Sequence, residues 1–309
     1  MAARRGVLTL EPQVFLGMAG LGKTLLAKIV THELGEHAEQ MGQSRPRFFE
    51  WFPADIPNVE RLDQLMQEVI DNPGCVVFID EVHDLKESHN LKLYLVLEEG
   101  RYKMAGPMEP VQLPPFTMLA ATTDWGAVHS ALKRRWISHQ LRPATEEQLL
   151  GYVMRRGFPI EDSAARSIVG RTKWSGAPWE ALQLYRIAAT TAEARGSATV
   201  EDADVERVFA TQEIDRFGLR WQDRRIMEVL FTQPKYRMVK KEPVFVAYAA
   251  SEQAVVTLAG IDRAEYRESV KPRLMSRGLL QVRATYGQSL TPRAEEWYKE
   301  LRDAQIAAG

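Results

Sequence analysis

The segment best equipped for chemistry is a glycine-rich stretch near the N-terminus. Residues 17–24 read Gly-Met-Ala-Gly-Leu-Gly-Lys-Thr, which matches the phosphate-binding pattern G-x-x-x-x-G-K-[ST]. A short apolar run precedes it and a helical pattern follows, as this pattern requires. Backbone N–H groups and the partial positive charge of a helix N-terminus would favour a triphosphate. The residues expected to contact it are Gly17, Met18, Ala19, Gly20, Leu21, Gly22, Lys23, Thr24 and Leu25.

Two side chains of this segment have predicted roles of their own. Lys23 should reach the β- and γ-phosphates, and the Thr24 hydroxyl should bind Mg²⁺. The predicted cofactors are therefore ATP and Mg²⁺. The alternative is a glycine-rich turn that binds nothing, and the complete pattern in its required context makes that interpretation weak.

A second candidate is a pair of acids at the end of a predicted strand. The run Val-Val-Phe-Ile over 76–79 is typical of a strand buried on both faces, and Asp80 and Glu81 follow it directly. Asp80 is placed to hold the Mg²⁺ shell, and Glu81 to polarise an attacking water. Alone, such a run more often marks a strand that reaches solvent, but its position downstream of a phosphate-binding loop favours catalysis.

Two weaker candidates lie further along the chain. The run 119–124 ends in hydroxyls, and Thr123 could hydrogen-bond the γ-phosphate or its attacking water; capping of the next helix is the simpler local interpretation. The basic cluster Lys133-Arg134-Arg135 follows a short helical pattern. One of its residues could act as a finger in a neighbouring subunit's site, or the cluster could only cap the helix.

The organisation of the chain predicts an α/β domain followed by two smaller parts. The first 142 residues alternate apolar runs with helical patterns, which indicates a parallel sheet with crossover helices. Residues 143–212 favour helices only, and from residue 218 the order is helix, helix, helix, then hairpin, as in a winged helix. Predicted strands are 14–16, 47–52, 75–79, 116–121 and 137–141, and predicted helices include 24–34, 59–70, 91–97 and 262–274.

The bulk composition excludes several classes of protein. The 309 residues are 45% hydrophobic and 26% charged, as in a globular protein of two or three domains. No apolar stretch is long enough for a membrane span and no signal peptide is recognisable, so a membrane partner is not expected. A single cysteine, Cys75, fits the reducing cytoplasm, and the six histidines lack zinc-ligand spacing. Net charge is −1, but residues 211–309 hold 17 basic and 13 acidic side chains, which suits either a DNA surface or a solvated face.

The order of these motifs resembles that of the AAA+ ATPases, and most closely that of the RuvB family of Holliday-junction motors. GMAGLGKTLLAKIV resembles its P-loop, FIDEVHDL its Walker B strand, LPPFTMLAATTD its sensor 1 strand and GLRWQDRRIMEVL the entry to its winged helix. LKRRW resembles the arginine-finger segment, which makes Arg135, next to Trp136, the better finger candidate than Arg134. The resemblance implies a P-loop AAA+ parallel-sheet domain at 1–142, a helical lid at 143–213 and a winged-helix DNA-binding domain at 214–309.

The same resemblance implies an ATP-dependent DNA translocase or helicase that drives branch migration of Holliday junctions in recombination and repair. It also implies DNA as a partner, a homo-oligomeric ring that is expected to be a hexamer, and a RuvA-like accessory protein. The alternative is a nucleotide-gated DNA-binding or loading ATPase, a clamp-loader-like switch without processive movement. An ATP-binding scaffold without turnover is least favoured, because both Lys23 and Glu81 are present.

Several residues depart from the RuvB pattern. Trp179 stands where the family has its sensor 2 arginine, and Arg171 or Lys173 are candidates to replace that cation. Sixteen residues precede Gly17, fewer than in the family, where this segment helps to hold the adenine. Two further departures concern partners: the segment 99–113 is shorter than the hairpin that docks on RuvA, and the wing offers only Arg283 and Tyr286 for DNA.

Overall fold

The computed structural model describes residues 2–4, 7–106, 109–239, 242–283 and 287–299. The chain separates into two compact units, Met1–Arg142 and Pro143–Gly309. Among the described residues, no helix combines the length and the apolar character needed to cross a membrane.

A five-stranded parallel sheet forms the centre of the first unit. Its strand order is β4-β5-β8-β3-β9, and each strand runs parallel to its neighbours. Parallel neighbours need crossover connections, so all carboxyl ends of the strands lie at one edge of the sheet. The strands are β3 (Gln13–Leu16), β4 (Phe48–Trp51), β5 (Val76–Ile79), β8 (Thr117–Thr122) and β9 (Ile137–Gln140).

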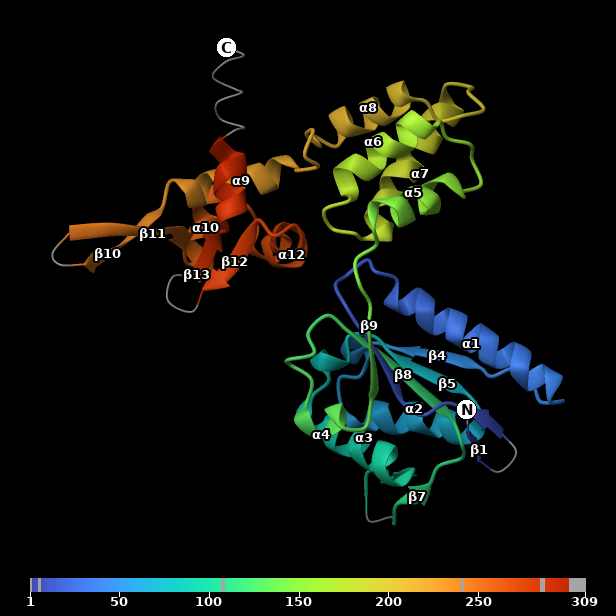
Figure 1. Ribbon diagram of the computed structural model, residues 1–309. Helices are drawn as coiled ribbons and strands as arrows, with labels where there is room; N and C mark the ends of the chain where they lie inside the picture. The colour runs from blue at the N-terminus through green and yellow to red at the C-terminus, as the bar shows by residue number, and fades with distance from the viewer. Residues whose placement is uncertain (1, 5–6, 107–108, 240–241, 284–286, 300–309) are drawn as a thin grey trace. The chain divides into compact units, whose positions relative to one another are not determined.

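Helices cover both faces of this sheet. Figure 1 shows α1 (Lys23–Gln40) on one face and α2 (Val59–Asp71) and α3 (Glu87–Glu99) on the other. Alternate residues of β5 accordingly belong to two cores: Val76 and Phe78 pack in the cluster that contains α1 residues, whereas Val77 and Ile79 pack in the cluster that contains α2 and α3 residues. Burial on both faces explains why the sequence of this strand is apolar without interruption.

The predicted end of the first helix at Gly35 is wrong, because α1 continues to Gln40. Gly35 lies buried within the helix, and a Cβ atom there would lie 3.3 Å from Cγ of Arg45. A glycine inside a helix costs only about 1 kcal/mol relative to alanine. Here it allows the segment after the helix to pass close to the helix backbone.

Short elements complete the first unit. An antiparallel pair, β6 (Arg101–Tyr102) and β7 (Val111–Gln112), forms the stem of the segment 99–113. The remaining elements are β1 (Ala2–Arg4), β2 (Val7–Thr9), the 3₁₀ turns η1 (Pro53–Asp55) and η2 (Val82–Asp84), and the helix α4 (Ser130–Lys133).

The second unit begins with four helices that share a separate core. Buried Leu149, Ile168, Leu184 and Phe209 come one from each helix. The first helix starts at a capping box, in which the Thr145 side chain accepts from the Gln148 N–H and the Gln148 side chain accepts from the Thr145 N–H. The helices are α5 (Glu146–Met154), α6 (Asp162–Thr172), α7 (Pro178–Ala194) and α8 (Asp202–Thr211).

The rest of the second unit combines helices with a four-stranded antiparallel sheet of order β10-β11-β13-β12. Ile226, Tyr266 and Leu274 are buried in a fourth core, which belongs to this part alone. The elements are α9 (Trp221–Phe231), β10 (Pro234–Val239), β11 (Glu242–Ala250), α10 (Glu252–Ala259), α11 (Arg263–Glu265), a π-helical turn η3 (Tyr266–Val270), α12 (Lys271–Ser276), β12 (Leu280–Arg283) and β13 (Gly287–Leu290).

The predicted order of three helices and one hairpin omitted a second hairpin. Strands β10 and β11 stand between α9 and α10, and neither was expected. Their sequence is rich in aromatic and β-branched residues, which favour strands, but its alternation is interrupted by a register shift between Lys235 and Tyr236. The predicted helix 262–274 is divided by the π-helical turn and ends at Ser276.

The helical part and the sheet-containing part of the second unit pack directly on each other. Buried Arg277 donates from one NH2 group to Oε1 of Glu180 at 2.9 Å, and from its other one to the carbonyl of Gly218. Trp297 also lies next to Trp174 of the helical part, with ring centroids 6.2 Å apart. Gly218 has φ +77°, and a Cβ there would lie 2.0 Å from the carbonyl oxygen of Arg171, so only glycine fits at this junction.

We expect Leu119→Ala to destabilise the first unit by about 2–5 kcal/mol, because it removes a fully buried side chain from the central strand β8. Leu91→Ala on α3 is the matched control: Leu91 is 57% exposed, and its loss should cost about 0.5 kcal/mol or less. Urea denaturation of both variants measures the difference. Equal shifts of the two midpoints would contradict the placement of β8 at the centre of the sheet.

Candidate active site

The phosphate-binding pattern occupies the turn between β3 and α1, at the carboxyl edge of the sheet. Gly20 and Gly22 have φ values of +80° and +89°, a left-handed conformation that residues with a side chain rarely adopt. Met18, Ala19 and Leu25 are exposed around this turn. The turn therefore has the backbone shape that the sequence pattern predicts.

The Lys23 ammonium group points back into this turn. Its Nζ donates to the carbonyl oxygens of Gly17 at 2.9 Å and Met18 at 3.2 Å, and lies 4.0 Å from Oε1 of Glu81. The side chain is 6% exposed. Burial lowers the pKa of Lys23 from its usual value, while the nearby carboxylates of Glu81 and Asp80 oppose this shift. A buried ammonium group that contacts only carbonyls and a distant carboxylate retains capacity to bind an anion.

The two predicted magnesium ligands are in contact. Oγ1 of Thr24 donates to Oδ2 of Asp80 at 3.1 Å. A hydroxyl and a carboxylate are oxygen ligands of the kind that Mg²⁺ prefers, and Mg²⁺ in nucleotide sites takes its other ligands from phosphates and water. Among the described residues there is no group of three or more acidic, histidine or cysteine side chains that could hold a metal. As oxygen ligands in contact with each other, Thr24 and Asp80 fit a Mg²⁺ ion that is bound together with a nucleotide.

Glu81 has an unusual backbone conformation, with φ +48°. A left-handed conformation costs a residue with a side chain about 1–3 kcal/mol and is concentrated at functional sites. Oδ1 of Asp80 accepts the Glu81 N–H at 3.0 Å, which stabilises this turn. Because of the turn, the two adjacent carboxylates take different partners: Asp80 contacts Thr24, and Glu81 contacts Thr123.

Thr123 holds the Glu81 carboxylate by two hydrogen bonds. Both its backbone N–H, at 2.8 Å, and its hydroxyl, at 3.0 Å, donate to Oε2 of Glu81. The sequence predicts that Thr123 contacts the γ-phosphate or its attacking water, or caps the next helix. The two hydrogen bonds add a further role, because they orient the Glu81 carboxylate.

His83 is a site residue whose contact with the acid is not predicted from the sequence. It lies in the 3₁₀ turn η2. Its Nδ1 is 3.2 Å from Oε2 of Glu81 and 2.9 Å from Oγ1 of Thr122. The only signal in the sequence is its position two residues after Glu81. Neighbours two apart face each other only because of the left-handed turn at Glu81.

The sheet topology explains why these residues meet. Strand β8 lies between β3 and β5 in the sheet. At its carboxyl end, β8 carries the threonine pair, β3 the phosphate-binding turn and β5 the acid pair. Residues distant in sequence therefore converge at one edge, as ligand sites of parallel sheets do.

Arg135 has no described contact with this cluster. Its guanidinium donates to Oε2 of Glu98 at 2.6 Å and to the Tyr94 hydroxyl at 3.0 Å, and it lies over the Tyr94 ring. Arg134 is exposed and has no ion pair with any residue that the structure describes. Of the two predicted finger candidates, Arg134 is thus the freer one and Arg135 is held on α3.

In the second unit, Trp179 lies in the first turn of α7 and is 58% exposed. The two cations that could replace a sensor 2 arginine are both engaged. Arg171 pairs with Glu206, and Nζ of Lys173 lies 3.0 Å from Oε2 of Glu146. Neither is a free cation at the start of α7. In the wing, Arg283 is half-buried on β12, and Tyr286 falls outside the described residues.

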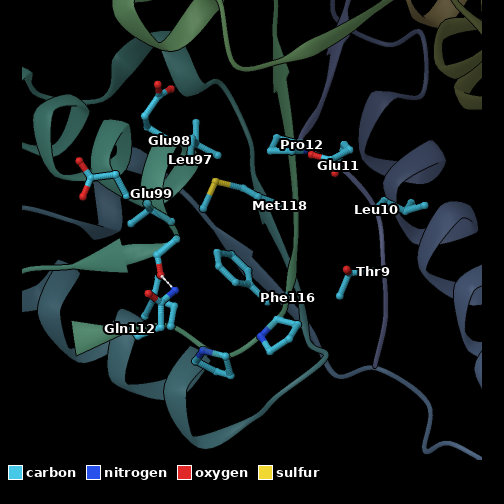
Figure 2. A pocket seen from close by; sticks show the side chains of 15 residues that line it. Thr9, Leu10, Glu11, Pro12, Leu97, Glu98, Glu99, Gln112, Phe116 and Met118 are labelled. Carbon is cyan, nitrogen blue, oxygen red and sulfur yellow. Dashed lines mark hydrogen bonds between the residues drawn. The ribbon is translucent and has the colours of Figure 1, made fainter. Parts of the chain in front are cut away.

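A cavity of about 420 Å³ lies at the opposite edge of the sheet from the site. Figure 2 shows residues 9–12 on one side of it and Leu97, Glu98 and Glu99 on the other. Its floor includes Phe116 and Met118, at the amino end of β8. None of the predicted nucleotide-contacting residues lines this cavity, so it is separate from the phosphate-binding turn.

Comparison with known proteins points to one family. Residues 1–141 match the family model described as the Holliday junction DNA helicase RuvB P-loop domain. The Holliday junction branch migration complex subunit RuvB of Microcystis aeruginosa is 25% identical over 307 residues, which cover 96% of this chain and 78% of that protein.

Solved structures agree on the fold. The RuvB Holliday junction branch migration motor of Thermotoga maritima superposes with a TM-score of 0.72 at 23% identity, covering 95% of this chain and 87% of that one. The ORC2 protein of Aeropyrum pernix gives a TM-score of 0.55 at 17% identity, and the match covers 96% of this chain and 89% of that one. The predicted fold class is confirmed: a P-loop α/β domain, a helical lid and a small antiparallel-sheet domain like the winged helix of RuvB. Residues 1–141 thus match the P-loop domain of RuvB, and the chain is similar to the RuvB-like AAA+ ATPases over nearly its whole length.

Proposed function

We propose that this chain is an ATP-dependent DNA translocase of the branch-migration type, working in recombination and repair. The observation that carries the proposal is the convergence of Lys23, the Thr24–Asp80 pair and Glu81 at one edge of the sheet. In the proposed division, 1–142 is the ATPase domain, 143–213 the lid and 214–309 a winged-helix DNA-binding domain. The acting form is a homo-oligomeric ring, a hexamer by analogy with the family.

The contacts of the site suggest a role for each residue. Lys23 exchanges the carbonyls of Gly17 and Met18 for the β- and γ-phosphate oxygens of ATP. Glu81, oriented by Thr123, accepts a hydrogen bond from the attacking water and polarises it towards the γ-phosphorus. Thr24 and Asp80 supply the protein ligands for Mg²⁺, which when bound neutralises charge on the β- and γ-phosphates.

Arg135 is proposed as the finger that completes the site of a neighbouring subunit. The support is the match of LKRRW to the family segment and the lack of any described contact with this chain's own acid pair. To act in trans, Arg135 must leave Glu98 and Tyr94 or carry them into the interface. A RuvA-like accessory protein is the least supported partner, because the β6–β7 stem carries only a short hairpin.

One observation favours a second candidate, a nucleotide-gated DNA-binding or loading ATPase. At the start of α7, Trp179 is exposed, and the two candidate cations Arg171 and Lys173 are both paired with acids of the lid. Without a cation on the γ-phosphate, closure of the lid would be coupled less strongly to hydrolysis. ATP would then control assembly and DNA affinity, and slow hydrolysis would time release.

We expect Lys23→Ala to abolish binding of a fluorescent ATP analogue, because it removes the cation of the phosphate-binding turn. Glu81→Gln should still bind the analogue, but its rate of ATP hydrolysis should fall by about 100-fold or more, the usual scale for loss of a general base. Ile29→Ala, an exposed position on the same helix as Lys23, is the control and should change neither property. Normal turnover by Glu81→Gln would falsify the role of that residue.

DNA should stimulate the ATPase of the wild-type chain. We expect duplex or four-way-junction DNA to raise the rate more than single strands do, and binding to weaken steeply with salt as counterions are released. Steady-state ATPase assays at low and high salt measure both effects. An ATPase rate that no DNA changes at low salt would count against any DNA motor. Tight ATP-dependent DNA binding without junction movement would favour the gated alternative.

Arg135→Ala should bind ATP normally and lose hydrolysis. Mixing it with Lys23→Ala subunits should restore part of the activity, because an intact Arg135 from one subunit then faces an intact site in the other. Arg134→Ala is the matched comparison and should keep most of its activity. Failure of the mixture to recover, or a larger loss in Arg134→Ala, would show that the finger is assigned to the wrong residue.

A further inference from the structure

The unexpected hairpin of β10 and β11, residues 234–250, is an arm that extends the sheet of the winged-helix part. Its inner end is anchored, because Ala249 and Ala250 pair with Ser289 and Gln288 of β13. Its outer part pairs only within the hairpin among the described residues. Figure 1 shows β10 and β11 reaching well beyond the helices of this part of the chain.

Two aromatic side chains stand together on the outer part of the arm. Tyr236 and Phe245 are directly opposite each other across the two strands, so they share one face. Their ring centroids lie 6.1 Å apart at an interplanar angle of 75°. Tyr236 is 58% exposed and Phe245 43% exposed. Large rings left in water in this way mark a surface that meets a partner.

The exposed rings are held by further aromatic contacts that lead back to α9. The ring centroids of Phe245 and Tyr248 lie 4.9 Å apart. Tyr248 stacks on Phe231 with ring centroids 4.4 Å apart and an interplanar angle of 20°. The chain of rings fixes the direction in which Phe245 faces. A partner that binds here meets a surface ordered in advance and loses less conformational entropy on binding.

The arm also concentrates positive charge. By sequence, residues 234–250 contain four basic side chains (Lys235, Arg237, Lys240 and Lys241) and one acidic side chain, Glu242. This net charge of +3 accounts for most of the +4 of residues 211–309, in a chain whose total is −1. Lys235 forms no ion pair with any described residue. The charge is therefore complementary to a phosphate backbone.

The backbone of the arm is poorly suited to pairing with a strand of another protein. Strand β10 is the edge of the sheet, but it begins at Pro234 and its register shifts between Lys235 and Tyr236. Proline, bulges and lysines are the features that prevent an edge strand from adding a neighbour. A partner must then recognise the side chains of the arm and not its hydrogen-bonding edge.

We propose that the arm binds an unpaired DNA strand, whose bases stack on Tyr236 and Phe245 while Lys235 contacts its phosphates. Exposed aromatic faces can stack on bases that are not already stacked in a duplex, and such stacking is tolerant of sequence. The inference rests on the proposed DNA role of the chain. It adds a second contact, for separated strands, beside the winged helix itself.

The test compares the affinity of the full chain for three labelled DNAs: an oligothymidine, a forked duplex and a blunt duplex. In the double variant Tyr236→Leu with Phe245→Leu, binding of the oligothymidine and the fork should weaken about tenfold, equivalent to about 1.4 kcal/mol. Binding of the blunt duplex should change less than about twofold, because it offers no free base faces. Leucine keeps apolar bulk on the strand, so circular dichroism and the melting midpoint verify that the arm folds.

Two matched variants separate stacking from other effects. Tyr236→Phe retains the ring and should bind like the wild type, whereas Lys235→Gln should lower the salt dependence of oligothymidine binding by about 0.7 in log–log slope. Leu258→Ala, an exposed apolar residue on α10 away from the arm, should change nothing.

The outcomes are distinguishable from failure of the proposed function. If the wild type binds no DNA, both proposals fall together. If it binds DNA and the double leucine variant binds all three DNAs as well as the wild type, or loses all three equally, only the arm proposal falls. A smaller assembly in sedimentation, with unchanged DNA affinity, would instead make the arm an interface between copies of the chain.

Discussion

The burial of one ammonium group beside two carboxylates is the interaction on which the rest of this site depends. Lys23 is nearly inaccessible to water, and it is held by carbonyls of the glycine-rich turn with Glu81 at 4.0 Å. A desolvated cation is costly unless an anion compensates it. The turn therefore stores an unmet preference for negative charge, which a triphosphate can satisfy better than the distant carboxylate does. Asp80 and Glu81 do not quench it because each is bound to a threonine, Thr24 or Thr123.

The central part of this arrangement could be predicted from the sequence for a physical reason. Strands buried on both faces must be apolar throughout, so β5 is visible as the run Val-Val-Phe-Ile before the acids. Glycines with left-handed φ values are equally visible, because few other residues occupy such positions. Parallel neighbours then bring the strand ends to one edge. The convergence of Lys23, Thr24, Asp80 and Glu81 follows from these local signals and the topology.

Other features could not be predicted because they depend on long-range contacts. The interaction of Arg135 with Glu98 and Tyr94 joins α3 to a segment after β8, and nothing local to the basic cluster indicates it. The contact of His83 with Glu81 depends on the left-handed conformation of Glu81, which a glutamate in the sequence does not predict. The arm was missed because its alternation is broken by a register shift and its face is aromatic without being buried.

The lid and the winged-helix part are joined by side-chain contacts as well as by the polypeptide chain. Glu180, in the first turn of α7 next to Trp179, accepts hydrogen bonds from Ser175 and from buried Arg277, which lies just before β12. Breaking a buried pair by removing one partner typically costs about 3–5 kcal/mol, so the two parts resist separation. A rotation of α7 would then carry Arg277, the attached wing strands and the arm with it. Because Trp179 lies in that same turn, a movement of α7 would reach the surfaces proposed to bind DNA as a rigid displacement, without requiring a separate signalling element.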